Sequence, residues 1–154
     1  MCWIINLINL KILFRKICIA SDHAGYKLKE KVKDFLINKN ISVFDLGPFN
    51  ENSVDYPDFA KKVSNRVKFN KSDVGILVCG SGTGMAISAN KIKGIRAAVC
   101  YNIQSTRLSR LHNNANIITL GSRLIKKEIA FELVKIFLNT KFEGGRHLRR
   151  VKKI

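Results

Sequence analysis

VGILVCGSGTGMAISAN, residues 74–90, decides the fold of this chain. Its first six residues form an apolar run, which is typical of a strand buried in a parallel sheet. A cysteine ends the run, three glycines alternate with hydroxyl residues after it, and a helical stretch follows. A strand that enters a helix through a glycine turn is half of a β–α–β unit, so the segment predicts an α/β protein.

Apolar runs of strand length alternate with stretches of helical spacing along most of the chain. The predicted strands lie at 16–21, 41–46, 74–79, 95–100 and 115–121. Three predicted helices span 24–39, 103–112 and 126–138. Two more are predicted, one that begins at Pro57 and one that includes Ala86 to Asn90. This alternation predicts a three-layer, Rossmann-like α/β fold, with a five-stranded parallel sheet flanked by helices.

A single domain suits a chain of 154 residues, 46% of which are hydrophobic. We expect it to span 16–154 and to end in a glycine hinge and a basic tail, FEGGRHLRRVKKI. Residues 1–15 are predicted to be an N-terminal extension. Their apolar stretch is shorter than the ~20 residues that span a bilayer. Arg15 and Lys16 follow it, whereas a secretory signal carries its positive charge ahead of the apolar stretch.

The charge and the cysteines narrow the class of protein. A net charge of +17, from 28 Lys and Arg against 11 Asp and Glu, is compatible with nucleic acid, a membrane surface or a phosphorylated metabolite as partner. We interpret most of it as a solvated coat, because many of the lysines lie among Asn and Ile and are scattered over the predicted outer faces. No aromatic–basic stacking motif supports nucleic-acid binding. The four cysteines have neither CxxC nor zinc-site spacing, which favours a reducing cytoplasm and no metal.

Polar residues follow the predicted strands at the edge where parallel sheets bind ligands. Asp22 and His23 come after the first strand, Cys79 ends the third, and Arg123 follows the fifth. We therefore expect a binding site at the carboxyl ends of the strands.

The glycine turn after Cys79 fails three known motifs. A P-loop needs Lys and Ser or Thr after its last glycine, where Met85 and Ala86 stand. A dinucleotide fingerprint has GxGxxG after the first strand, whereas this turn is GxGxG after the third. A cysteine phosphatase loop needs an arginine where Met85 stands.

The remaining interpretation is a thiol beside a cradle of backbone amides. Glycines let successive N–H groups approach an anion, and a helix N-terminus stabilises negative charge there. The same field favours a thiolate, so the turn can supply both a base and an oxyanion site. A buried structural cysteine is an equally good interpretation of Cys79 from this turn alone.

Seven segments together carry a more specific signal. They are SDHAG (21–25), DYPDFA (55–60), CGSGTGMAISANK (79–91), GIRAAVC (94–100), LSRLHNNAN (108–116), TLGSR (119–123) and EGGRHLRRV (143–151). In order and spacing they resemble the B-type ribose-5-phosphate isomerases, a family grouped with the galactose-6-phosphate isomerase subunits. The resemblance runs from about Lys16 to the C-terminus and leaves only the first fifteen or so residues outside.

The resemblance implies an aldose–ketose isomerisation between ribose 5-phosphate and ribulose 5-phosphate, a step of the pentose phosphate pathway, without metal or cofactor. By this resemblance Cys79 is the base, His112 catalyses ring opening, and Asn113 binds sugar oxygens. Backbone amides of the loop hold the enediolate. The loop consists of Gly80, Ser81, Gly82, Thr83 and Gly84.

The remaining implied ligands contact ring oxygens or phosphate. They are Asp22, His23, Arg123, Arg146 and Arg150. Asp22 could equally be a helix N-cap, and Arg146 and Arg150 could belong to a solvated tail. Family members share active sites between two subunits, so a homodimer or a dimer of dimers is implied, with no nucleic acid or membrane as partner.

Two alternatives stay open. The first is an isomerase of a six-carbon phosphate such as allose or galactose 6-phosphate, although the galactose branch lacks the GGRH arrangement of 144–147. The second is a basic nucleic-acid-binding protein. Some relatives replace the thiol by a carboxylate at a later position, which corresponds to Gly84 here, so the thiol version applies.

Overall fold

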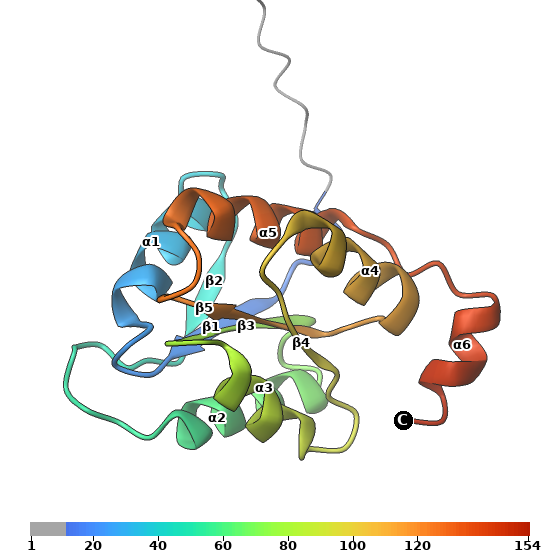
Figure 1. Ribbon diagram of the computed structural model, residues 1–154, viewed down its shortest axis with the longest axis horizontal. Coiled ribbons are helices and arrows are strands. Elements are labelled where there is room, and N and C mark those ends of the chain that lie inside the picture. Colours follow the sequence, from blue (N-terminus) through green and yellow to red (C-terminus); the bar gives the residue numbers. More distant parts are fainter. Residues whose placement is uncertain (1–11) are drawn as a thin grey trace, which may run out of the picture.

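The computed structural model describes residues 12–154, which form five strands and six helices (Figure 1). The strands are β1 (Ile17–Ser21), β2 (Val43–Asp45), β3 (Val74–Cys79), β4 (Ala97–Val99) and β5 (Ile117–Gly121). The helices are α1 (Tyr26–Ile37), α2 (Tyr56–Lys68), α3 (Thr83–Asn90), α4 (Ile103–Asn113), α5 (Lys127–Asn139) and α6 (Arg146–Val151). No helix within this range is both long and apolar enough to cross a membrane.

The five strands form one parallel sheet in the order β2-β1-β3-β5-β4, which confirms the predicted α/β fold. Helices α1, α4 and α5 cover one face of the sheet, and α2 and α3 cover the other (Figure 1). From β1 the chain first moves outward to β2 and then crosses back to β3 on the other side of β1. The adjacent ends of β1 and β3 therefore mark the topological switch point, where open α/β sheets bind ligands.

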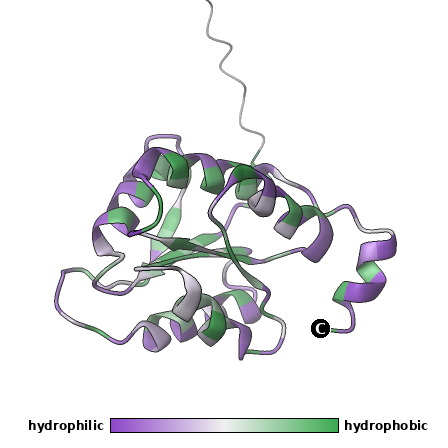
Figure 2. Ribbon diagram, in the orientation of Figure 1, coloured by the Kyte–Doolittle hydropathy of each residue, from purple (hydrophilic) through white to green (hydrophobic). Residues whose placement is uncertain are grey.

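The core is divided by the sheet because successive strand side chains point to opposite faces. Ile76 and Val78 of β3 pack with α1 and α5, whereas Leu77 and Cys79 pack with α2 and α3. Hydrophobic residues accordingly line the inner surfaces of both helical layers (Figure 2). This alternation directs the Cys79 side chain toward the α3 side of the switch point.

The two ends of the described chain both contact or extend the domain. Residues 1–11, most of the predicted extension, lie outside the described residues. The segment that follows is attached to the domain: the Leu13 amide donates to the Leu138 carbonyl at 3.2 Å, and the Lys16 amide donates to Asp73 at 2.9 Å. At the other end, the basic tail after the glycine hinge forms α6.

A buried cation holds the loop after β2 in place. Lys29 of α1 is fully buried, and its Nζ lies 3.0 Å from the carboxylate of Asp45, 2.9 Å from Glu30 and 2.7 Å from the carbonyl of Pro48. Lys33 contacts the same Asp45 carboxylate at 2.8 Å. Because a buried ammonium without partners is costly, this network ties α1, β2 and the loop into one unit.

We expect the Asp45→Asn substitution to destabilise the fold by about 3 kcal/mol, because it leaves the buried Lys29 with one carboxylate fewer. Urea unfolding measures the change. The matched control is Glu51→Gln, which removes a carboxylate from the exposed Lys27–Glu51 pair and should cost less than about 1 kcal/mol. Equal losses in the two variants would contradict the structural role of the buried network.

The same network predicts a pH dependence. Burial by itself would raise the pKa of Asp45, but hydrogen bonds from Lys33, the Gly47 amide and Lys29 lower it overall. A lowered folded-state pKa adds stability that is complete above the unfolded value of about 3.9 and disappears as pH falls through the folded value. The wild-type chain should therefore lose stability more steeply than Asp45→Asn below about pH 4.

Candidate active site

The thiol of Cys79 lies at the carboxyl end of β3, where the glycine loop begins. Its side chain is 4% exposed, and its sulfur accepts a hydrogen bond from the Gly82 amide at 3.1 Å. Gly82 has φ of +81°, a conformation that side chains disfavour, and α3 starts at the next residue. The sulfur therefore sits just under the surface, beside the positive end of a helix.

Backbone contacts place Arg123 against the same loop. The amides of Ser122 and Arg123 donate to the carbonyls of Cys79 and Gly80 at 2.8 and 3.0 Å. The guanidinium then packs on Gly80 so closely that a Cβ there would lie 2.9 Å from Nη1. The predicted neighbourhood of Cys79 and Arg123 is thus present within one chain.

Asp22 and His23 lie at the neighbouring end of β1. The Asp22 amide donates to the Val78 carbonyl at 3.1 Å, and its buried carboxylate accepts from the Gly25 amide at 2.8 Å, so it holds the turn that leads into α1. Nδ1 of His23 lies 3.2 Å from the carbonyl oxygen of Val54 in the loop before α2. The expected role of Asp22 as a helix N-cap is therefore wrong, because Gly25 is the N-cap of α1 and Asp22 instead holds the turn that precedes it.

Tyr56 is a neighbour of the glycine loop that the sequence analysis did not single out. Its ring lies where a Cβ on Gly84 would come within 2.9 Å of it, and the side chain is 42% exposed. The DYPDFA segment contains this position, and its match to the family was the available signal for it.

His112 and Asn113 lie near the amino ends of the strands, opposite the end that carries Cys79. They end α4, and the chain then enters β5 at Ile117, which pairs with Gly75. Gly75 precedes Cys79 by four residues, which is about 13 Å along a strand. The structure therefore does not bring His112 to Cys79 within one chain.

The end of α4 is held by its own set of contacts. Nε of Arg96 donates to the carbonyls of Asn113 and Asn114 at 3.1 Å each, and Asn114 ends the helix with φ of +46°. The Glu143 amide donates to the Leu111 carbonyl at 3.1 Å, which brings the C-terminal segment beside His112.

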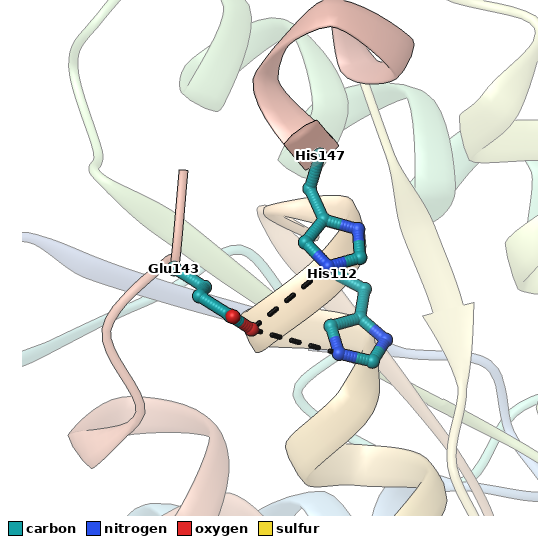
Figure 3. A group of neighbouring side chains, drawn as sticks. All are labelled: His112, Glu143 and His147. Carbon is teal, nitrogen blue, oxygen red and sulfur yellow. Dashed lines mark ion pairs between the residues drawn. The ribbon is translucent and has the colours of Figure 1, made fainter. Parts of the chain in front are cut away.

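The C-terminal segment adds two more side chains to His112. Gly144 and Gly145 have φ of +72° and +51°, so the chain can turn sharply into α6. His147 then stacks on His112 with ring centroids 4.1 Å apart, and a carboxylate oxygen of Glu143 faces Nε2 of both rings (Figure 3). Neither Glu143 nor His147 was a predicted site residue, although both lie in the EGGRH segment.

This group of two imidazoles and one carboxylate resembles a metal-ligand set, since its ligand atoms lie within 4.8 Å of one another. A metal ion binds an imidazole nitrogen along the lone pair, in the plane of the ring. The two rings are only 10° from parallel, so one ion cannot lie in both planes. As placed, the cluster therefore does not fit a metal site.

Arg146 and Arg150 occupy one face of α6, since they are four residues apart. Both are exposed, and the helix lies at the edge of the molecule beyond α4 (Figure 1). The predicted site residues therefore form two groups. The thiol group consists of Asp22, His23, Cys79, the loop 80–84 and Arg123. The imidazole group consists of His112, Asn113, Arg146 and Arg150.

Comparisons of the whole chain with known proteins agree with the resemblance found in the sequence segments. The family model described as Ribose/Galactose Isomerase matches residues 17–154. The ribose-5-phosphate isomerase B of Escherichia coli K12 is 41% identical over 140 residues, covering 91% of this chain and 94% of that protein.

Solved structures agree with the fold in detail. A ribose 5-phosphate isomerase of Thermotoga maritima is 56% identical with a TM-score of 0.88, covering 90% of this chain and 95% of that one. A ribose-5-phosphate isomerase B of Mycoplasma genitalium, with bound ribulose-5-phosphate, is 45% identical with a TM-score of 0.85 and covers 89% and 91%. Fold, site and sequence together establish that this chain belongs to the Ribose/Galactose Isomerase family.

Proposed function

We propose that this chain interconverts ribose 5-phosphate and ribulose 5-phosphate. The observation that carries the proposal is the thiol at the switch point, with the Gly82 amide 3.1 Å from its sulfur and the Arg123 guanidinium on the adjoining Gly80. The relatives named ribose-5-phosphate isomerase B support the choice of a pentose phosphate.

The reaction moves one hydrogen between two neighbouring carbons. The thiolate of Cys79 takes the proton from C2 of the open-chain aldose, and the electron pair forms the C1–C2 double bond while C1–O becomes an oxyanion. The same thiol returns the proton to C1, and the proton of the C2 hydroxyl passes to the C1 oxyanion, so that C2 becomes the ketone and C1 becomes a hydroxymethyl group. Amides of Gly80 to Gly84 stabilise the enediolate, where one donor is worth roughly 10²–10³ in rate.

The imidazole group opens the sugar ring and binds the phosphate. His112 handles the proton transfer that opens the furanose, and Asn113 binds sugar oxygens. Arg146 and Arg150 hold the phosphate, because a planar guanidinium can donate two hydrogen bonds to neighbouring oxygens. Asp22, His23 and Arg123 complete the binding of the sugar and phosphate from the thiol side.

The thiol group lies at the carboxyl ends of the strands and the imidazole group lies at their amino ends, so we propose that a second copy of the chain completes each site. In a homodimer, or a dimer of dimers, the thiol group of one subunit faces the imidazole group of the other. A two-fold axis then creates two equivalent sites. We also propose a cytoplasmic location, because a reducing compartment keeps the Cys79 thiol free to act as a base.

We expect Cys79→Ala to lower kcat for ribose 5-phosphate by more than roughly 10³-fold, since it removes the base. A coupled assay in the presence of a chelator measures turnover. Exchange of the C1 hydrogen of ribulose 5-phosphate with D₂O, followed by NMR, measures the proton transfer directly, and it should also stop.

The matched control for this variant is Cys18→Ala. Cys18 is also a buried strand thiol, but burial raises its pKa to about 11, so it is not a base at neutral pH. The control should retain turnover within about twofold after correction for folded protein. Full activity in Cys79→Ala would remove the thiol from the mechanism.

Sharing of the site predicts complementation between two inactive variants. Cys79→Ala and His112→Asn should each be inactive toward ribose 5-phosphate when purified alone. Random mixing after co-refolding makes half of the dimers mixed, and each mixed dimer has one intact site, so roughly a quarter of wild-type activity should return. If each chain carries its own complete site, mixing restores nothing.

A further inference from the structure

The stacked pair His112 and His147 shares one carboxylate. Oε2 of Glu143 lies 3.7 Å from Nε2 of His112 and 3.9 Å from Nε2 of His147, and the two rings are 10° from parallel (Figure 3). His147 is 5% exposed, whereas the Glu143 side chain is 56% exposed. The carboxylate can therefore move, but the buried ring of His147 is fixed by its surroundings.

The surroundings of His147 favour the neutral form of its ring. Nε of Arg146 lies 3.5 Å from its Nε2, an arrangement that favours a lone pair on this nitrogen and the proton on Nδ1. Desolvation lowers the pKa of His147, positive charge on His112, Arg146 and Arg150 lowers it further, and Glu143 only partly opposes this. His147 thus has no proton on Nε2 to offer the carboxylate.

Nε2 of His112 is then the ring nitrogen placed to donate to Glu143. A separation of 3.7 Å is longer than a direct hydrogen bond, but a small movement of the exposed carboxylate closes it. Catalytic hydrogen bonds are often long in sites without substrate. With Nε2 protonated, Nδ1 of His112 has the free lone pair.

We propose that Glu143 and His147 are positioning residues that prepare His112 for ring opening, Glu143 by holding a proton on Nε2 and His147 by fixing the plane of the ring. The inference rests on the proposed function and deepens it. Nδ1 of His112 takes the O1 hydroxyl proton as the bond from C1 to the ring oxygen breaks and C1=O forms. The imidazolium, stabilised by Glu143, gives that proton to the ring oxygen, so His112 ends neutral.

The chemistry of the two sugars separates ring opening from isomerisation. Ribose 5-phosphate closes into a furanose, whereas ribulose 5-phosphate stays open, because the oxygen that would close its ring carries the phosphate. Hydrogen exchange at C1 of ribulose 5-phosphate therefore needs the thiol but not ring opening. A defect in positioning His112 should therefore slow the turnover of ribose 5-phosphate and leave the C1 hydrogen exchange of ribulose 5-phosphate unchanged.

The decisive variant is Glu143→Gln, which keeps the size of the side chain but removes its charge. We expect kcat/KM for ribose 5-phosphate to fall roughly tenfold, a part of the 10²–10⁴-fold that general acid–base catalysis contributes. The C1 exchange of ribulose 5-phosphate in D₂O should change by less than about twofold. Glu132→Gln, an exposed carboxylate paired with Lys135 on α5, is the matched control and should leave both rates unchanged.

A second measurement does not depend on turnover. The ¹⁵N chemical shifts of His112 report which ring nitrogen carries the proton, and wild-type protein should show the Nε2–H tautomer. Glu143→Gln should mix the two tautomers, and His147→Phe should keep Nε2–H, because Phe preserves the stack and leaves the carboxylate to His112.

Each outcome bears on a different claim. Equal slowing of ribose 5-phosphate turnover and ribulose 5-phosphate exchange in Glu143→Gln overturns the positioning role, and so does an unchanged His112 tautomer. If wild-type protein performs neither reaction, the proposed function fails instead, and the ¹⁵N spectra still decide whether Glu143 sets the tautomer of His112.

Discussion

The site depends on how closely backbone segments approach one another at the carboxyl end of β3. A Cβ on Gly25 would overlap the carbonyl of Val78, and a Cβ on Gly121 would lie 2.7 Å from the carbonyl oxygen of Ser81. Glycine is the residue that allows such approaches. Because α1 and the end of β5 can come this near, Asp22, Cys79 and the loop amides share one small region.

The imidazole group is held together by a glycine hinge and by hydrogen bonds to the end of α4. Here a short glycine hinge turns the C-terminal segment back onto α4, and the Arg96 side chain and the Glu143 amide donate hydrogen bonds to carbonyls at the end of that helix. The result is a stacked pair of rings with guanidinium groups nearby. The carboxyl ends of the strands therefore carry the Cys79 thiol and the loop amides, and the opposite ends carry the two imidazoles and the exposed guanidinium groups.

The excess of positive charge has more than one use. Lys29 and Arg110 are 0% and 4% exposed and bind carboxylates or carbonyls inside the fold, so they belong to its structure. Arg146 and Arg150 are exposed beside the imidazole pair, where an anionic ligand would meet them. Only the remaining exposed lysines and arginines fit the description of a solvated coat.

Hydrophobic spacing by itself determined the α/β alternation, all five strands and their approximate limits, because burial on two faces demands continuous apolar runs. Segment matches identified the family and drew attention to Cys79 and His112. Only the tertiary structure decided the strand order β2-β1-β3-β5-β4, and with it how the two residues are placed across the sheet, since strand order is not written in local spacing. It also brought Glu143 and His147 to His112, because a contact across 31 residues depends on where the glycine hinge turns the chain.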